Sequence, residues 1–352
     1  MKTKIKKNIR GMKAYFVPQA FDGVKLNQNE SPLDIPKELK EEIFRRLEET
    51  QWNRYPEDFP GALIKRIAAY TNFPEEGIMA ANSSNELIQT LIYASCDTGD
   101  QILTVTPTFS VYGMAASVMN IETLAVPLKA DFSFDVPAII KKIGESKQLK
   151  TVILASPNNP TGTVLGIDEI KAIAKKTSGL LVIDEAYFEF YGESAQSLIE
   201  TYDNIVVLRT FSKALRSAGI RLGYLLAREA VVKELKKAKL PFSVGIFQQV
   251  AGEVLLENRE LLLENIETTL REREQLFNRM QTIPFIRPVP SKANFILFRS
   301  TSIPPGVLYR SLRQLGILVR AYDGPGMEDM LRVAIGTPAE NAMFLGALRS
   351  LK

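Results

Sequence analysis

The chain has 352 residues, of which 45% are hydrophobic and 24% are charged, and 44 basic against 40 acidic side chains leave a net charge of only +4. These values exclude a disordered chain and give no support for a nucleic-acid-binding protein. At roughly 150 residues per domain the length predicts two lobes, and no run approaches the roughly 18 apolar residues of a membrane helix.

The chain contains one cysteine, Cys96, and no histidine. A single cysteine cannot form an internal disulfide, and its place in the apolar run 91–96 predicts a core residue in a reducing cytosol. Without histidine, Ser-His-Asp and Cys-His pairs and most catalytic zinc sites are excluded. The basic stretch 2–13 lacks the apolar segment of a signal peptide. We therefore expect a soluble cytoplasmic protein with no metal site and no membrane or nucleic-acid partner.

The order of the predicted elements indicates an α/β fold. Residues 1–45 contain three prolines and little periodicity, so we expect a wrapping segment that joins the C-terminal lobe. From about residue 78, β-branched runs alternate with amphipathic stretches, which predicts a large domain, 46–252, with a mostly parallel sheet. Its expected strands are 101–105, 151–155, 180–184, 205–209 and 221–226, with helices such as 166–176 between them.

A long, charged, amphipathic stretch, 253–280, predicts one connecting helix into a second, smaller domain, 253–352. The strands expected in that domain are 293–298, 316–319 and 331–335. Ligands of such α/β sheets bind at the carboxyl ends of the strands. The polar residues of interest in this chain lie at those ends.

Lys213 follows a predicted strand in the run RTFSK, and Arg221 follows eight residues later in GIRLG. A lysine in that position can be partly desolvated, which lowers its pKa and frees the amine to attack an aldehyde. Alone the observation is weak, because lysines in strand-to-helix loops are usually solvated surface residues.

Asp184 ends another predicted strand, and Tyr187 lies three residues beyond it in DEAY. A protonated pyridine ring needs a carboxylate partner at its nitrogen, and a phenol can hydrogen-bond the ring hydroxyl. An isolated aspartate at this place could equally be a helix N-cap or a magnesium ligand.

Two polar turns complete the pattern. SPNNPTG at 156–162 follows a strand and offers the Asn159 amide as a donor to a ring oxygen, although its composition is also that of an ordinary turn. ANSSNEL at 81–87 opens an apolar helix, whose free N–H groups and positive end suit a phosphate. The same residues could form a capping box without any ligand.

In this order, SPNNPTG, DEAY, FSK and GIRLG, with Asp184 and Lys213 29 residues apart, resemble the fold-type I aminotransferases that depend on pyridoxal phosphate (PLP). More narrowly, LNQNES at 26–31, RYPE at 54–57, ANFILF at 293–298 and RVAIGTPAEN at 332–341 resemble the histidinol-phosphate aminotransferase family. The resemblance covers nearly the whole chain. It implies the three-layer αβα PLP-transferase fold with a smaller α+β C-terminal domain.

The resemblance implies a role for each matching residue. Lys213 would hold the cofactor as an imine and then move a proton between the substrate α-carbon and the cofactor C4′. Asp184 would pair with the pyridine nitrogen, while Tyr187 and Asn159 would bond the ring oxygen. The other implied cofactor contacts are Phe109 on the ring face and Ser84, Asn85, Ser212 and Arg221 at the phosphate.

Arginines are the main substrate contacts that the resemblance implies, because a guanidinium binds carboxylate or phosphate through two parallel hydrogen bonds. Arg332 matches the arginine that binds the α-carboxylate of glutamate and 2-oxoglutarate. Arg320 matches a second, phosphate-binding arginine, Tyr15 matches a tyrosine near that phosphate, and Asn29 is a further expected contact. Tyr55, in RYPE, is implied to reach the phosphate of the partner subunit's cofactor, so a homodimer is expected.

Two positions depart from the family pattern. Ser83-Ser84-Asn85 stands where many relatives have Gly-Ser-Asp, which affects the fine geometry of the phosphate turn more than its backbone donors. Phe109 replaces a frequent tyrosine, which keeps the stacking face and loses a hydroxyl. The second departure bears on substrate specificity.

The resemblance implies transfer of the amino group of L-histidinol phosphate to 2-oxoglutarate, giving imidazole acetol phosphate and glutamate in histidine biosynthesis. Threonine-phosphate decarboxylase and an aromatic or branched-chain aminotransferase are the alternative enzymes. A PLP-binding regulatory module is the non-enzymatic alternative, and intact Asp184, Lys213 and Arg221 argue against it.

Overall fold

The computed structural model describes residues 4–14, 21–322, 324 and 326–351. Its central feature is a seven-stranded sheet in the order β2-β8-β7-β6-β5-β3-β4. All neighbouring strands run parallel except at β8, which is antiparallel to both β2 and β7. The strands are β2 (Ile78–Ala81), β3 (Gln101–Thr106), β4 (Glu122–Pro127), β5 (Leu149–Ala155), β6 (Leu180–Asp184), β7 (Ile205–Thr210) and β8 (Gly223–Leu226). The mostly parallel sheet predicted from the sequence is confirmed.

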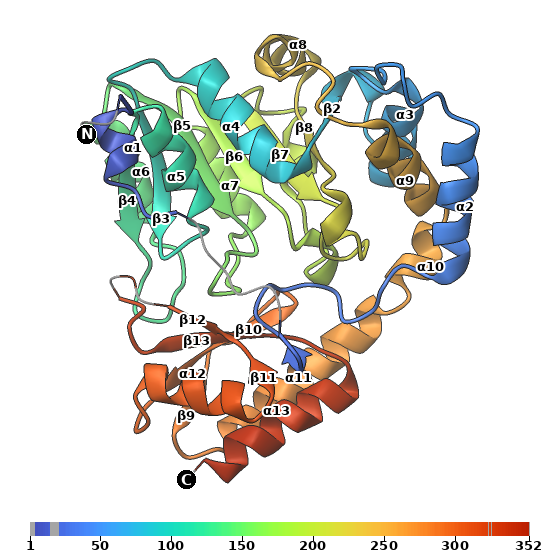
Figure 1. The fold of residues 1–352 in the computed structure, drawn as a ribbon. Coiled ribbons are helices and arrows are strands. Elements are labelled where there is room, and N and C mark those ends of the chain that lie inside the picture. Colours follow the sequence, from blue (N-terminus) through green and yellow to red (C-terminus); the bar gives the residue numbers. More distant parts are fainter. Residues whose placement is uncertain (1–3, 15–20, 323, 325, 352) are drawn as a thin grey trace.

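Helices cover both faces of this sheet and give the three layers of the predicted fold (Figure 1). The helices over one face are α4 (Ser83–Ser95), α5 (Val111–Val118) and α8 (Glu229–Ala238). Those over the other are α3 (Gly61–Thr71), α6 (Val136–Glu145), α7 (Ile167–Ala174) and α9 (Ile246–Glu257), and α2 (Lys37–Glu48) packs on the outside of α9. Strands buried on both faces read as continuous apolar runs, which explains why the predicted strands match closely.

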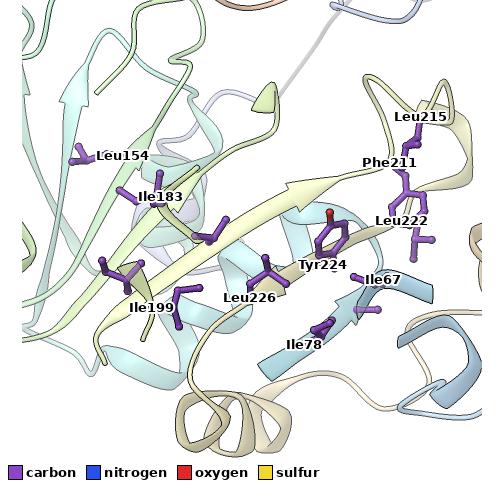
Figure 2. Packing of buried hydrophobic residues seen from close by; sticks show 14 of the residues in the cluster. Ile67, Ile78, Leu154, Ile183, Ile199, Phe211, Leu215, Leu222, Tyr224 and Leu226 are labelled. Atoms are coloured by element: carbon purple, nitrogen blue, oxygen red, sulfur yellow. The ribbon is translucent and has the colours of Figure 1, made fainter. Parts of the chain in front are cut away.

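Alternate side chains of the strands enter two separate hydrophobic clusters. On β5, Leu154 joins the cluster beneath α3, α6 and α7, whereas Ile153 points to the opposite cluster beneath α4 and α5. Figure 2 shows the first cluster, in which Leu154 and Ile183 continue toward Phe211 and Tyr224. These side chains are almost fully buried and hold the ends of the central strands in fixed positions.

A second, smaller sheet is antiparallel and has the order β12-β13-β10-β9. Its strands are β9 (Ile286–Pro288), β10 (Phe295–Ser300), β12 (Arg320–Ala321) and β13 (Met330–Ala334), and α11 (Ile266–Gln281), α12 (Pro305–Gln314) and α13 (Pro338–Ser350) pack beside it. β1 (Val24–Lys25) pairs in parallel with β11 (Ile317–Leu318), so this part of the N-terminal segment lies in the lower part of the molecule, whereas α1 (Lys7–Arg10) lies beside α5 (Figure 1). The predicted limits of the two domains stay a prediction.

The remaining elements are single turns or short helices. They are α1 (Lys7–Arg10), α10 (Arg259–Leu263), η1 (Glu75–Gly77), η2 (Phe188–Phe190), η3 (Ala195–Leu198) and η4 (Ala218–Ile220). Within the described ranges, none of the helices has the length and apolar composition that crossing a membrane requires.

Two expectations about helices are wrong. The single helix expected over 253–280 is instead three helices, α9, α10 and α11. Asn258 separates the first two with φ −112° and ψ 27°, and its side-chain amide donates to the Val254 carbonyl at 2.9 Å. An asparagine side chain that hydrogen-bonds to the nearby backbone competes with the backbone hydrogen bonds of the helix, and this favours a break in the helix. The N-terminal segment, in which little periodicity was expected, contains α2, whose Leu39, Ile43 and Leu47 form a buried stripe.

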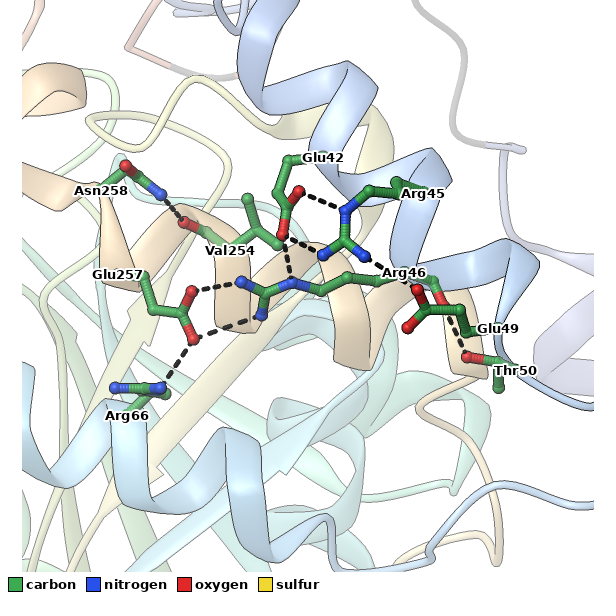
Figure 3. A network of polar contacts seen from close by, with 9 residues as sticks. All are labelled: Glu42, Arg45, Arg46, Glu49, Thr50, Arg66, Val254, Glu257 and Asn258. Atoms are coloured by element: carbon green, nitrogen blue, oxygen red, sulfur yellow. Dashed lines mark hydrogen bonds and ion pairs between the residues drawn. The ribbon is translucent and has the colours of Figure 1, made fainter.

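Charged side chains join α2, α3 and α9 at their exposed edges (Figure 3). Glu257 on α9 accepts hydrogen bonds from Arg46 of α2 at 2.6 Å and forms an ion pair with Arg66 of α3 at 2.7 Å. Arg46 also contacts Glu42 at 2.7 Å. Partly solvated ion pairs of this kind contribute about 0–1 kcal/mol each. The apolar contacts beneath them therefore account for most of the stability of this packing.

We expect two helical glycines to respond in opposite directions to alanine. At Gly252 of α9 an added Cβ would lie 2.6 Å from Leu222 and 2.7 Å from Leu63, whereas at Gly346 of α13 it meets nothing within 4 Å. Gly252→Ala should lower the free energy of unfolding by about 1–3 kcal/mol through overpacking. Gly346→Ala should raise it by about 0.5–1 kcal/mol through helix propensity. Urea unfolding of both variants measures the difference, and a stabilising Gly252→Ala would contradict the close packing of α3 and α9.

Candidate active site

Lys213 lies in the loop that follows β7, next to the fully buried side chain of Phe211. Its ammonium donates to the main-chain carbonyl of Gln28 at 2.9 Å, in the N-terminal segment. Burial, and after it the nearby Arg332 guanidinium, lower the pKa of Lys213 to about 7. A lysine with this pKa supplies a neutral, nucleophilic amine near neutral pH.

Asp184 ends β6, the strand beside β7, so its carboxylate belongs to the same edge of the sheet. One oxygen accepts the Ala186 N–H at 3.1 Å, and the other accepts the Tyr112 hydroxyl at 2.7 Å. Burial raises the pKa of Asp184, and these two hydrogen bonds oppose the rise. Sequence reasoning missed Tyr112, whose only signal was its position three residues after Phe109.

Tyr187 brings residues from three parts of the chain together. Its hydroxyl oxygen accepts hydrogen bonds from the amides of Asn29 at 2.9 Å and Asn159 at 3.3 Å. Its ring centre lies 5.9 Å from the Lys213 amine. Burial raises the pKa of Tyr187 to about 12, although Arg332 opposes the change. The phenol therefore keeps its proton and can donate a hydrogen bond.

Arg332, on β13 of the smaller sheet, reaches the same group of residues. Its guanidinium donates to Asn159 Oδ1 at 2.6 Å and to the Asn27 carbonyl at 2.8 Å. Its Nε is buried and has no hydrogen-bond partner among the described residues. Arg320 stands opposite Arg332 in the β12–β13 register, with its guanidinium 5.9 Å from the Tyr322 ring centre. Arg320 and Arg332 are thus paired on adjacent strands of the smaller sheet.

The start of α4 and the first residue of β8 approach each other closely. A Cβ added at Gly223 would lie 2.5 Å from the Ser84 backbone nitrogen, so glycine is needed for this approach. Ser84 and Asn85 occupy the first turn of α4, where backbone N–H groups lack partners within the helix. Ser212 and the turn at Arg221 border the same region, because β7 pairs with β8. The arrangement can bind an anion.

Gln248 on α9 links the two turns of this anion cradle. Its amide donates to Asn82 Oδ1 at 3.0 Å and to the Arg221 carbonyl at 2.7 Å. Arg221 itself has a left-handed backbone, φ 62°, and its side chain is exposed. The sequence carried no local signal for Gln248, because its contacts are with residues far away in the chain.

A buried ion pair holds the ends of β6 and β7 together behind the site. Arg209 contacts Glu185 at 3.0 Å and lies 3.7 Å above the Phe188 ring. Ser194 donates to the same carboxylate at 2.8 Å and accepts from Arg209 at 2.8 Å. Glu185 directly follows Asp184, and Arg209 precedes Lys213 by four residues. Sequence reasoning did not single out this pair, which fixes the two strands from which the site residues emerge.

Three of the predicted residues stand apart from this network. Phe109 packs edge-on against Tyr112, with ring centres 5.6 Å apart. Tyr112 in turn contacts Asp184, so Phe109 is linked to the network through Tyr112. Tyr55 is 83% exposed and stacks on Phe242 at 4.7 Å, and none of its observed contacts reaches Lys213. Tyr15 lies outside the described residues.

Comparison with known proteins assigns this arrangement to a family. The model of the family described as aminotransferase class I and II matches residues 22–348. The chain belongs to this family. The aminotransferase is 42% identical to histidinol-phosphate aminotransferase 1 of Carboxydothermus hydrogenoformans, over 92% of each chain. It is 38% identical to histidinol-phosphate aminotransferase of Chlorobium phaeovibrioides, over 98% of this chain and 96% of that one.

Solved structures agree with the assignment. The histidinol-phosphate aminotransferase of Clostridium acetobutylicum has a TM-score of 0.86 and 26% identity to this aminotransferase, covering 93% of this chain and 98% of that one. The Sinorhizobium meliloti enzyme, solved in complex with pyridoxal-5′-phosphate, has a TM-score of 0.88 at 19% identity and shows the shared fold, covering 100% and 99% of the two chains. The resemblance drawn from the sequence motifs is confirmed.

The pKa of Lys213 makes the reaction of the apo-aminotransferase with an aldehyde depend on pH. Because the charged form dominates below a pKa of about 7, the rate of covalent PLP capture should rise as pH increases through 7 and then level off. Arg332→Gln should raise the pKa of Lys213 and move this midpoint to higher pH. Stopped-flow absorbance measures the rate. Arg320→Gln is the matched control, and an equal shift in both variants would contradict the assigned effect of Arg332.

Proposed function

We propose that this aminotransferase transfers the amino group of L-histidinol phosphate to 2-oxoglutarate, with PLP as its cofactor. The products are imidazole acetol phosphate and glutamate, and the reaction belongs to histidine biosynthesis. Relatives that carry this activity in their names are 35–42% identical over at least 92% of the chain. The observation that carries the proposal is the Lys213 amine, with a pKa of about 7, beside Tyr187 at the end of the parallel sheet.

The residues present fit a phosphorylated pyridine aldehyde. The backbone N–H groups in the first turn of α4 suit a phosphate, and the buried carboxylate of Asp184 suits a protonated ring nitrogen. Tyr187 and Asn159, which are already joined by a hydrogen bond, would hold the ring oxygen. The other side chains proposed to contact the cofactor are Phe109, Ser84, Asn85, Ser212 and Arg221.

In the reaction, the bound cofactor supplies a ring that withdraws electrons from the substrate α-carbon. Lys213 would accept the α-proton of the substrate and would be the group that returns it at the C4′ atom, because its near-neutral pKa allows transfer in both directions. Asp184 would hold the ring nitrogen, and Tyr187 would donate a hydrogen bond to the ring oxygen. The N-terminal segment, with Gln28 against Lys213, helps to exclude water.

Arg332 is the proposed contact of the substrate carboxylate in the 2-oxoglutarate half of the reaction. Its unpartnered Nε leaves a donor for an anion, and its other nitrogens are held by Asn159 and Asn27. Arg320 is placed to bind the phosphate of the amine substrate. Asn29 and Tyr15 are proposed as further substrate contacts.

We also propose that the functional unit is a homodimer in the cytoplasm. Tyr55 is 83% exposed and stacks on Phe242, which is itself 42% exposed. Large apolar groups gathered on a surface favour a protein–protein contact. Tyr55 would cross this contact to the cofactor phosphate of the second subunit. The proposed limits of the large and small domains are 46–252 and 253–352, with the segment 1–45 attached to the latter through the pairing of β1 with β11.

Lys213→Ala should abolish transamination, with a loss of more than about 10³-fold in kcat. Lys175→Ala, at an exposed position after α7, should leave the rate unchanged. Glutamate formation from L-histidinol phosphate and 2-oxoglutarate measures both. Undiminished turnover in Lys213→Ala would overturn the assignment of the catalytic lysine.

The same assay separates the proposed substrate from its rivals. L-Histidinol without its phosphate should react poorly, since Arg320 would then lose its anionic partner. L-Threonine O-3-phosphate should release no carbon dioxide. Carbon dioxide release without 2-oxoglutarate would identify a decarboxylase, and equal rates with and without phosphate would identify an aminotransferase for another amine.

Mixed dimers test the crossing of Tyr55. Tyr55→Ala should weaken PLP binding by about tenfold, the loss of roughly one phosphate hydrogen bond. A hybrid of one Lys213→Ala and one Tyr55→Ala subunit contains a site with wild-type Lys213 and the partner's wild-type Tyr55. Subunit exchange should therefore restore tight PLP binding and turnover to half of the sites in each hybrid. If the turnover and PLP affinity of the mixture do not exceed those of Tyr55→Ala alone, the crossing of Tyr55 into the partner's site is contradicted.

A further inference from the structure

Tyr112 is a buried hydroxyl-bearing residue that the proposed function does not use. It lies on α5 with 0% of its side chain exposed, and its hydroxyl donates to Asp184 Oδ2 at 2.7 Å. Asp184 itself is 4% exposed. A tyrosine and a carboxylate buried to this degree form a charge-assisted hydrogen bond that excludes water.

This hydrogen bond sets both the charge and the orientation of Asp184. The other carboxylate oxygen accepts the Ala186 N–H, which the turn after β6 would offer to any side chain at position 184. Tyr112 is the one side chain seen to donate to Asp184 among the described residues. Burial disfavours an ionised carboxylate, and a donor to its charged form offsets that penalty. Without the phenol, the carboxylate would keep a single backbone donor and could rotate.

Tyr112 also contacts a second residue of the proposed cofactor site. Its ring meets Phe109 edge-on, at an interplanar angle of 85° and with centres 5.6 Å apart. Phe109 is the proposed stacking residue, and Asp184 is the proposed partner of the ring nitrogen. A single rigid side chain therefore touches both groups that would fix the plane of the cofactor.

We propose that Tyr112 is a positioning residue, which holds the Asp184 carboxylate ionised and aimed at the cofactor ring nitrogen. The proposal rests on the role of Asp184 in the proposed function. Tyr112 acts through Asp184 and touches neither substrate nor the reacting atoms. Its hydroxyl lowers the basicity of the carboxylate, so that the shared proton stays on the ring nitrogen.

Tyr112→Phe removes the hydroxyl and keeps the ring contact with Phe109. In the holoenzyme, the ¹⁵N resonance of PLP labelled at the ring nitrogen should move toward the position of unprotonated pyridine. The dissociation constant of PLP should rise by about tenfold, equivalent to one charge-assisted hydrogen bond of about 1.4 kcal/mol. The kcat should fall by a similar factor, while KM for both substrates stays nearly constant.

Tyr70→Phe is the matched control. Tyr70 also donates to a carboxylate, Glu189 at 3.1 Å, but that pair makes no contact with Asp184. Its removal should leave the ¹⁵N resonance and the affinity for PLP unchanged. If the loss of the phenol hydroxyl had only a structural effect, the free energy of unfolding would change in both variants, and the ¹⁵N resonance would change in neither.

Asp184→Asn separates the two hypotheses. If Asp184 has its proposed role, Asp184→Asn shifts the ¹⁵N resonance strongly, and adding Tyr112→Phe to it produces no further shift. An unchanged resonance in Asp184→Asn would refute the role of Asp184 itself. A shift in Asp184→Asn with a wild-type resonance and PLP affinity in Tyr112→Phe would overturn the proposal for Tyr112 alone. A Tyr112→Phe chain that fails to fold would also overturn it, because the hydroxyl would then serve the fold.

Discussion

Burial of the Lys213 amine beside the Arg332 guanidinium is the constraint on which the site depends. Both the loss of water and the nearby cation disfavour the ammonium form, and together they bring the pKa of Lys213 to about 7. The Gln28 carbonyl accepts from the amine and offsets part of this cost. Such an arrangement destabilises the charged residue locally. It persists because rigid neighbouring structure holds Lys213 and Arg332 in place.

The central sheet provides that rigidity. β6 and β7 lie side by side in the middle of the sheet, are almost entirely buried, and end at Asp184 and shortly before Lys213. The Arg209–Glu185 ion pair joins the two strands behind the site. A broken pair of this kind leaves an uncompensated buried charge, which costs several kcal/mol. The chemistry of the loop residues thus rests on interactions that never touch the substrate.

The strands and the motifs at their ends were predictable, because buried parallel strands are continuous apolar runs bounded by polar turns. β6 occupies the predicted residues, 180–184. The break at Asn258 was not predictable from periodicity, since the apolar stripe continues on both sides of it. Tyr112 was missed because it meets Asp184 across 72 positions of the chain, through the packing of α5 on the sheet. The contact of Lys213 with the Gln28 carbonyl could not be predicted, because every residue type carries a main-chain carbonyl.

The most direct test of the central claim is the visible absorbance of the purified protein during titration with L-histidinol phosphate. A band from PLP bound to Lys213 should bleach as the cofactor takes up the amino group, and 2-oxoglutarate should restore it. A band that ignores L-histidinol phosphate but responds to another amine would contradict the proposed substrate. The absence of any such band, even after PLP is added, would contradict the account of Lys213 as a whole.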